Sequence, residues 1–431
     1  MQYVKSIGSN LILQIIQVVI GIFTSIFIYR GIGAEGNGYA RYLLLLVNII
    51  GQYGHLGILN SVTHFLKKKN YRREEIITTN VIYSIIIFLI YEIIIIFFKA
   101  KGKIINEYNT IIVIMVGFII LFNYISIIAS SVYTGENKLL KMNRILKNMQ
   151  FIRLICLFSL YLTKSLTVNS FLIYTVIESL VRSYLLIKKL DFNFDLSCKI
   201  NTEIILKEFK YGFFINISAL LIFLNYRVDQ IMVKEFLNLK SFGVYSLGVT
   251  LSELLLLIPK SVSSALMAKL YNVDRSIEKG KVALFTVKYT FLACLLLSCV
   301  GMFLAELVPL FYGDEYRESV LVIRVLFWGI TFASLGKVLS SFFLEKEKNR
   351  VVLNISVLTF IINFIINLYT IPKYGIVGAA LASSVSYFIY GTAYLILFLK
   401  NVEVKVGTFL FKLSNEEYNF IKKFKALLPL R

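Results

Sequence analysis

Long runs of apolar residues, separated by short polar segments, dominate the sequence. A helix that crosses a bilayer needs about 20 consecutive apolar residues, and twelve runs come close to or exceed that length. The pattern therefore predicts an all-α polytopic membrane protein, with the fifth helix the shortest. The expected helices are residues 8–29, 38–60, 77–98, 110–133, 149–163, 167–187, 211–233, 241–262, 284–307, 320–343, 351–371 and 376–399.

Composition agrees with this pattern. Of the 431 residues, 58% are apolar, whereas a soluble domain has about 45–50%. The mean hydropathy is +0.75. The first apolar run follows a single Lys and is too long for a signal-peptide core. It also lacks a cleavage site of small residues, so we expect a retained first helix.

The net charge of +21 would indicate nucleic-acid binding in a soluble protein. In a polytopic chain it has another interpretation. With twelve spans both termini lie on one side, and most Lys and Arg residues fall in the loops on that side. The positive-inside rule then predicts cytoplasmic termini and no nucleic-acid partner.

The two halves of the sequence resemble each other. The segment EGNGYARY follows the first helix, and KSFGVYSL follows the seventh; SVYTGENK and SFFLEKEK form a second such pair. Six spans in each copy predict two six-helix lobes related by an axis along the membrane normal. The expected parts are an N-terminal lobe at 1–187, a cytoplasmic linker at 188–210, a C-terminal lobe at 211–399 and a cytoplasmic amphipathic tail at 400–431.

Polar residues recur on single faces of the first, second, seventh and eighth helices. Hydrogen bonding between helices explains the amides as well as a polar path does. For Arg227, Asp229 and Glu253 a water-filled cavity is favoured, because charge in the bilayer is costly. Glu178 and Arg182 have the spacing of a local ion pair, and no partner is evident for Glu92.

Motifs for catalysis, ATP hydrolysis and metal binding are missing from the sequence. It has no G-x-x-x-x-G-K-[ST], G-x-S-x-G or H-E-x-x-H segment, and its two histidines are too few for a zinc site. The outer loops leave little room for catalytic groups. We therefore expect neither an enzyme nor a bound cofactor.

The segments EGNGY after the first helix, NYRVDQIMV in the seventh and FGVY after it resemble those of bacterial polysaccharide-unit flippases. These transport O-antigen or capsule repeat units and belong to the multidrug/oligosaccharidyl-lipid/polysaccharide exporter (MOP) superfamily. The resemblance covers nearly the whole chain. It implies a central cavity between two lobes that opens to each side of the bacterial inner membrane in turn.

The resemblance also implies a cargo, which is a glycan on undecaprenyl diphosphate carried to the outer leaflet. Polymerase and other assembly proteins are implied partners, together with membrane lipids. An Arg suits the diphosphate, and Asp229 and Glu253 are candidates for coupling to a proton or sodium gradient. The substrate-path candidates are Arg30, Arg41, Gln14, Gln17, Asn48, Gln52, Asn225 and Arg227.

Three alternative functions make different demands on the sequence. A multidrug exporter of the same superfamily would favour carboxylates over arginines in its cavity and typically has a proline in the first helix, which this chain lacks. A lipid II flippase generally has extra spans. A membrane polysaccharide polymerase would need functional groups clustered on an outer loop.

Overall fold

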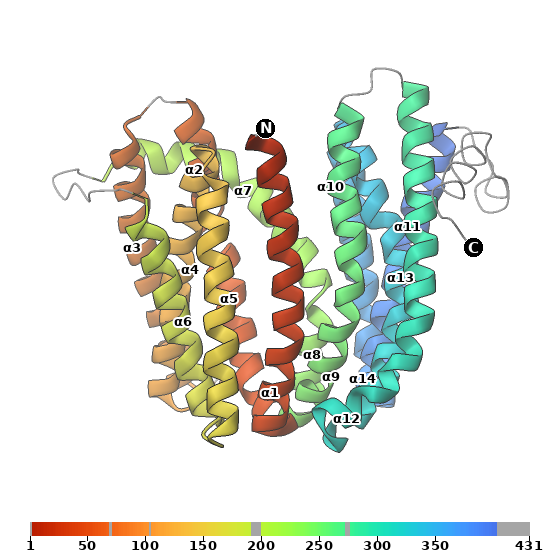
Figure 1. Ribbon diagram of the computed structural model, residues 1–431, viewed down its shortest axis with the longest axis horizontal. Coiled ribbons are helices and arrows are strands. Elements are labelled where there is room, and N and C mark those ends of the chain that lie inside the picture. The colour runs from red at the N-terminus through yellow and green to blue at the C-terminus, as the bar shows by residue number, and fades with distance from the viewer. Residues whose placement is uncertain (1, 69–70, 103–104, 191–199, 272–275, 403–431) are drawn as a thin grey trace, which may run out of the picture. The chain divides into compact units, whose positions relative to one another are not determined.

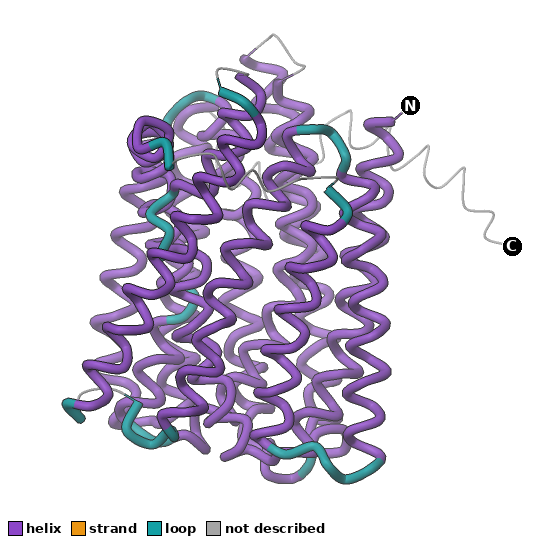
Figure 2. Tube along the Cα trace, turned by 90° about the vertical axis from the view of Figure 1, so that its left-hand side faces the viewer, coloured by secondary structure: helices purple, strands orange, loops and turns teal. Residues whose placement is uncertain are grey.

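The computed structural model describes residues 2–68, 71–102, 105–190, 200–271 and 276–402. All regular elements in these ranges are helices joined by short loops (Figure 2). The chain divides into two compact units. Unit 1 is Met1–Phe223 with Asn238–Val244 and Phe311–Glu315, and unit 2 is Leu224–Leu237, Tyr245–Leu310 and Tyr316–Arg431.

Seven helices lie wholly or mostly in unit 1 and run largely side by side (Figure 1). They are α1 (Gln2–Tyr53), α2 (Ile58–Lys68), α3 (Arg73–Ala100), α4 (Thr110–Gly135), α5 (Leu139–Leu162), α6 (Val168–Lys188) and α7 (Thr202–Asn225). Side chains stop some of them from fraying. Asn109 caps α4 by accepting from the amide of Ile111 at 2.8 Å, and Thr167 with Ser170 forms a capping box at α6.

Unit 2 contains the remaining helices. They are α8 (Val228–Phe236), α9 (Leu239–Ser252), α10 (Leu257–Tyr271), α11 (Ser276–Leu304), α12 (Val308–Tyr312), α13 (Arg317–Glu345) and α14 (Asn349–Val402), with single 3₁₀ turns at Glu253–Leu256, Ala305–Leu307 and Asp314–Tyr316. The first residues of α9 and the last of α12 belong to unit 1. The core of unit 2 lies where α10, α11, α13 and α14 meet, around Phe342, Phe398 and Leu339.

Within the described ranges, nine helical segments are long and apolar enough to cross a membrane, or ten if α7 and α8 form one broken span. This confirms a multi-pass helical membrane protein. The helices α1 and α14 have 52 and 54 residues, and each is kinked at a glycine with positive φ, Gly33 or Gly375. Each is more than twice the length that one span needs. The count of twelve spans stays a prediction.

Several helix boundaries differ from those expected. Helix α5 begins at Leu139, ten residues before the expected start, because its first turns carry Lys141, Asn143 and Arg144 and break the apolar run. Helix α7 begins at Thr202, inside the segment 188–210 expected to be a linker. The expected helix 241–262 is interrupted by the 3₁₀ turn that starts at Glu253. The tail beyond residue 402 and residues 191–199 of the expected linker lie outside the described residues.

Helix α7 docks on α2 and α3 through one polar face. Asn80 donates to both carboxylate oxygens of the buried Glu208, at 3.2 and 3.0 Å, and Ser61 donates to the backbone carbonyl of Glu208. Gly212 lies against the backbone of Gly57, where a Cβ on Gly212 would be 2.1 Å from the Gly57 oxygen. Unit 1 therefore includes most of α7. The expected lobes at 1–187 and 211–399 were defined by the sequence repeat, whereas the two compact units are defined by packing. The lobe boundaries therefore stay a prediction.

The glycines of the two repeated motifs lie together in unit 1. A Cβ on Gly38 would be 1.7 Å from the carbonyl oxygen of Leu239, and one on Gly243 would be 2.0 Å from that of Ala34. Two backbones approach each other here so closely that no other residue type fits without a shift. This contact gives a physical reason for Gly in EGNGY and FGVY.

Candidate functional site

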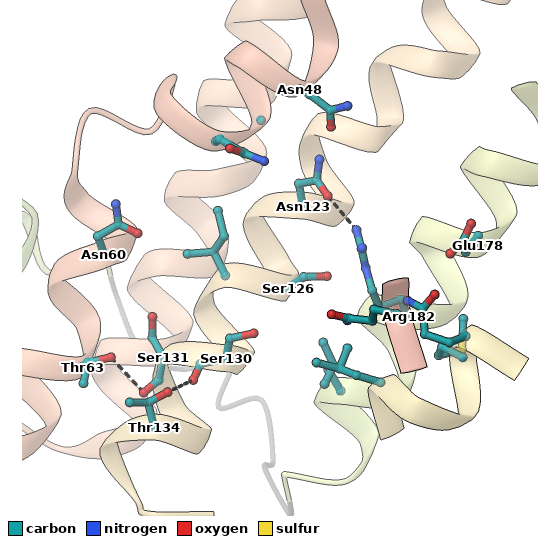
Figure 3. A pocket seen from close by; sticks show the side chains of 18 residues that line it. Asn48, Asn60, Thr63, Asn123, Ser126, Ser130, Ser131, Thr134, Glu178 and Arg182 are labelled. Carbon is teal, nitrogen blue, oxygen red and sulfur yellow. Dashed lines mark hydrogen bonds between the residues drawn. The ribbon is translucent and has the colours of Figure 1, made fainter. Parts of the chain in front are cut away.

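A polar pocket of about 560 Å³ lies inside unit 1. Helices α1, α2, α4, α5 and α6 form its wall, and several of its polar side chains are drawn in Figure 3. The lining residues are Gln17, Asn48, Gly51, Gln52, Asn60, Thr63, Asn123, Ser126, Ile127, Ser130, Ser131, Thr134, Leu146, Met149, Gln150, Glu178, Arg182 and Leu186.

Neutral hydrogen-bonding groups dominate this lining. Six of the eighteen residues carry an amide and five a hydroxyl, whereas none is aromatic. Two carry a formal charge, Glu178 and Arg182. Amides and hydroxyls both donate and accept hydrogen bonds. Such a wall matches a ligand rich in hydroxyl groups better than a large apolar cation.

Helix α4 supplies a polar stripe to this wall, although it is not one of the four helices expected to carry the path. Asn123, Ser126, Ser130 and Thr134 recur every three or four residues and so share one face. The signal is present in the sequence but weak, because a helical hydroxyl can bond its own backbone. Thr134 does so, donating to the carbonyl of Ser130 at 2.8 Å.

Arg182 on α6 points into the pocket (Figure 3). One of its terminal nitrogens donates to the amide oxygen of Asn123 at 2.8 Å. Its Nε is buried and has no hydrogen-bond partner among the described residues. The expected ion pair of Arg182 with Glu178 is not formed. Glu178 instead lies 3.9 Å from Arg153 of α5, because α5 and α6 pack together. Arg182 therefore retains donors for an anion.

A helix break shapes one side of the pocket. Helix α1 ends at Tyr53 and α2 starts at Ile58, with positive φ at Leu56 and Gly57 between them. Three backbone carbonyls at the break accept hydrogen bonds from tyrosine hydroxyls of α3 and α4. The bonds are Tyr124 to Ile50 at 3.0 Å, Tyr91 to Gly54 at 2.8 Å and Tyr83 to His55 at 3.4 Å.

Three of the expected path residues, Gln17, Asn48 and Gln52, line this pocket. Gln14 is exposed on α1 but is not part of the wall. The structure thus brings together amides from both halves of α1, on either side of the kink at Gly33.

Arg30 and Arg41 lie outside the pocket. Arg30 is an exposed residue three positions before the kink of α1. The guanidinium of Arg41 lies over the ring of Tyr29, 4.3 Å from its centroid, in a cation–π contact.

The other candidates belong to unit 2. Arg227 makes a bidentate ion pair with Glu253, with distances of 2.7 and 2.9 Å from its terminal nitrogens to the carboxylate oxygens. Asp229, two residues from Arg227 in the sequence, could have neutralised Arg227 or another cation, but Glu253 is the residue that forms the ion pair. The actual partner comes from the 3₁₀ turn after α9. Because both groups are engaged, neither is a free charge for a substrate.

Asp229 on α8 is fully enclosed in unit 2, with 2% of its surface exposed. Its carboxylate accepts hydrogen bonds from Tyr245 and Ser383, both at 2.6 Å, and from the amide of Gln230 at 2.7 Å. Asn363 of α14 donates in turn to Ser383 at 3.3 Å. All of these donors are neutral. Asn225, at the end of α7, donates to Thr359 at 3.4 Å.

Comparison with known proteins relates this arrangement to transporters. A family model described as "Polysaccharide biosynthesis protein" matches residues 3–271, and one described as "MatE" matches residues 215–369. The capsular polysaccharide biosynthesis protein CapF of Staphylococcus aureus is 27% identical over 290 residues, which are 64% of this chain and 72% of CapF.

Two solved structures share the fold. The lipid II flippase MurJ in an inward closed conformation has a TM-score of 0.67 and 15% identity, with 96% of each chain covered. An inward-facing multidrug resistance MATE transporter of the MOP superfamily has a TM-score of 0.66 and 14% identity, with 90% of this chain and 94% of that one covered. Since the first family model matches more than half of the sequence, the chain belongs to the polysaccharide biosynthesis protein family, with the fold of MOP-superfamily transporters.

Proposed function

We propose that this protein is a flippase that moves undecaprenyl-diphosphate-linked oligosaccharide repeat units from the cytoplasmic to the outer leaflet by alternating access. The observation that carries the proposal is the pocket of unit 1, where eleven of eighteen lining residues are amides or hydroxyls beside a single Arg. The family model and the similarity to a capsular polysaccharide protein support the same class of cargo.

In this proposal the pocket binds the polar head of the cargo. The neutral side chains exchange hydrogen bonds with sugar hydroxyls, and Arg182 attracts an anionic group through the donors that Asn123 leaves unused. The path candidates Gln17, Asn48 and Gln52 keep their expected role. Arg227 moves to a structural role, because Glu253 occupies both of its terminal nitrogens.

Asp229 remains the candidate for coupling to a proton or sodium gradient. It is a buried carboxylate held by neutral donors, and such a group changes its free energy strongly when a cation binds. Glu253 is no longer a candidate for ion coupling, because its carboxylate is paired with Arg227. The protein is further proposed to lie in the bacterial inner membrane with both termini in the cytoplasm, and to work with a polymerase of the assembly pathway.

The test replaces the chromosomal copy with Arg182→Ala and measures lipid-linked glycan and surface polymer. Loss of a charge-assisted hydrogen bond of about 1.5–3 kcal/mol corresponds to roughly a 10- to 100-fold loss of binding. We expect single repeat units to accumulate on the lipid in the inner leaflet, with less surface polymer. Arg144→Ala, which removes an exposed cation of α5 outside the pocket, is the matched control.

Three outcomes would contradict parts of the proposal. Normal polymer in the Arg182→Ala strain, at wild-type protein level, would remove Arg182 from the path. Normal glycolipid and polymer in a deletion strain, with raised sensitivity to cationic drugs, would favour a multidrug exporter, to which the match of the MatE model to residues 215–369 gives independent support. Accumulated glycolipid in the outer leaflet would instead indicate a polymerase defect.

A further inference from the structure

Glu92 of α3 is a buried carboxyl group with no partner. Its exposed fraction is 8%, and both of its side-chain oxygens are buried without a hydrogen-bond donor from any described residue. It lies against Gly117 of α4, where a Cβ would be 2.1 Å from one carboxyl oxygen. The missing side chain at Gly117 therefore makes the space that Glu92 occupies.

The helices around Glu92 offer it no compensating charge. Helix α4 contains no Asp, Glu, Lys, Arg or His, and its tyrosines, Tyr124 and Tyr133, donate to backbone carbonyls. On α3 the nearest cation is Lys99, almost two turns away, which donates to the carbonyl of Ile105 at 3.3 Å. Tyr91 donates to the carbonyl of Gly54.

The remaining ionisable groups of the neighbouring helices are engaged or distant along the chain. On α2, His64 stacks on Tyr211 with a centroid distance of 4.1 Å, and Lys67 and Lys68 are exposed at its end. On α1, Arg41 lies over Tyr29, and His55 accepts from the amide of Gly57. The first turn of α3, with Arg73, Glu74 and Glu75, is separated from Glu92 by about five turns of helix.

The position of Glu92 along α3 is within the apolar part of the helix. Ile90, Ile93 and Ile94 beside it are exposed apolar side chains, with 45%, 66% and 42% of their surface accessible. An unpaired carboxylate is expensive in such surroundings, and a carboxyl group avoids the cost by holding a proton.

We propose that Glu92 is a proton-binding site of unit 1, neutral while α3 packs on α4 and charged only when that contact opens to water. Release breaks the O–H bond of the carboxyl group and transfers the proton to water, leaving a carboxylate. The negative charge then disfavours the contact with Gly117. Proton occupancy and α3–α4 packing are thereby linked, independently of the cargo and of the proposed function.

The first test is infrared spectroscopy of the purified full-length protein, wild type against Glu92→Gln. We expect the variant to lose intensity in the carbonyl band of a protonated carboxyl group. Loss of carboxylate intensity instead would overturn the proposal. Glu345→Gln is the control, because the side chain of Glu345 is largely enclosed but pairs with Lys279 at 2.5 Å. That variant should lose carboxylate intensity.

The second test needs no variant, so a folding defect cannot obscure it. Dicyclohexylcarbodiimide attacks protonated carboxyl groups in apolar surroundings, and peptide mass spectrometry locates the adduct. We expect labelling of Glu92 that declines as pH rises, with Glu345 unlabelled. Labelling of Glu345 in preference to Glu92 would count against the proposal. Neither test involves transport, so a failed flippase assay leaves both results interpretable.

Thermal unfolding tests whether proton binding at Glu92 is linked to the packing of α3 on α4. As pH rises, the melting temperature of the wild type should fall relative to that of Glu92→Gln, whose side chain stays neutral at every pH. Parallel pH profiles for the two proteins would show that the proton is not linked to the packing of α3.

Discussion

The polar groups of the two units are arranged in opposite ways. In unit 1 the amides and hydroxyls of α1, α2, α4 and α5 face a pocket of about 560 Å³, and Arg182 has a donor to spare. In unit 2 the charged groups Arg227, Glu253 and Asp229 are each held by protein partners. Polar residues in the helices therefore occur in two arrangements, lining a pocket in unit 1 and bonded to other protein groups in unit 2.

This contrast supports our proposal that the cargo binds in unit 1, whereas Arg227 and Glu253 stabilise unit 2. Buried charges in unit 2 find partners because isolated charge is costly in a membrane. A neutral side chain that lacks some of its hydrogen bonds costs less free energy than an unpaired charge. A pocket lined by amides and hydroxyls can therefore exist without a bound ligand. Substitution of Arg227 or Glu253 should therefore act mainly on stability, and substitutions in the pocket of unit 1 mainly on transport.

The largest expected effect is that of Arg227→Ala. It leaves Glu253 without its bidentate partner, and breaking a buried ion pair costs about 3–5 kcal/mol; the side chains are 24% and 23% exposed, so we expect the low end. Thermal unfolding in detergent measures the loss. Replacing both residues by Leu should recover most of it. An equal loss in the double variant would show that the pair itself is not the cause.

Tyr245→Phe should have the next largest effect. It removes one of the donors to the Asp229 carboxylate, and a hydrogen bond to a charged group contributes about 1.5–3 kcal/mol. Tyr83→Phe is a suitable control, since its hydroxyl makes a longer bond of 3.4 Å to a neutral carbonyl. A similar fall in melting temperature for the two variants would argue against a special role of Asp229.

Asn60→Ala should change stability little and transport more. Asn60 is an exposed side chain in the pocket wall, and a substitution at such a site usually shifts unfolding by less than about 0.5 kcal/mol. One lost hydrogen bond of about 1 kcal/mol predicts roughly fivefold weaker binding of the cargo. The ratio of lipid-linked glycan to surface polymer measures it. An unchanged ratio would place Asn60 off the path.

The smallest expected effect is a change in melting temperature on substitution of Glu136, a charged residue of unit 1 outside the membrane-spanning helices. Burial alone would raise the pKa of Glu136, but its contacts with Lys138 and Arg73 outweigh this and lower it. The carboxylate thus stabilises the fold above its ordinary pKa, and this contribution is lost as pH falls through the lowered value. Melting temperatures of wild type and Glu136→Gln should differ at neutral pH and converge in acid. A constant difference would exclude the ion pair as its source.

Much of the fold was predictable from apolar periodicity, including α3, α4, α6 and α13, whose ends differ from expectation by a few residues. The polar path was predictable in part. Gln17, Asn48 and Gln52 line the pocket because their spacing fixes one helix face. Arg182 was assigned to a local pair, since the sequence does not show that Asn123 and Arg153 come from neighbouring helices. Tertiary pairing decides which charged groups remain available.

The docking of α7 on α2 and α3 has a consequence for biosynthesis. Residues 1–187 emerge from the ribosome before α7, and at that stage Asn80 and the carbonyl of Tyr53 lack the partners that Glu208 and Asn216 later supply. The N-terminal helices therefore lack these hydrogen-bond partners until synthesis has passed residue 216. A truncation at 187 should be a substrate for membrane quality-control proteases, whereas one ending after α7 should persist longer.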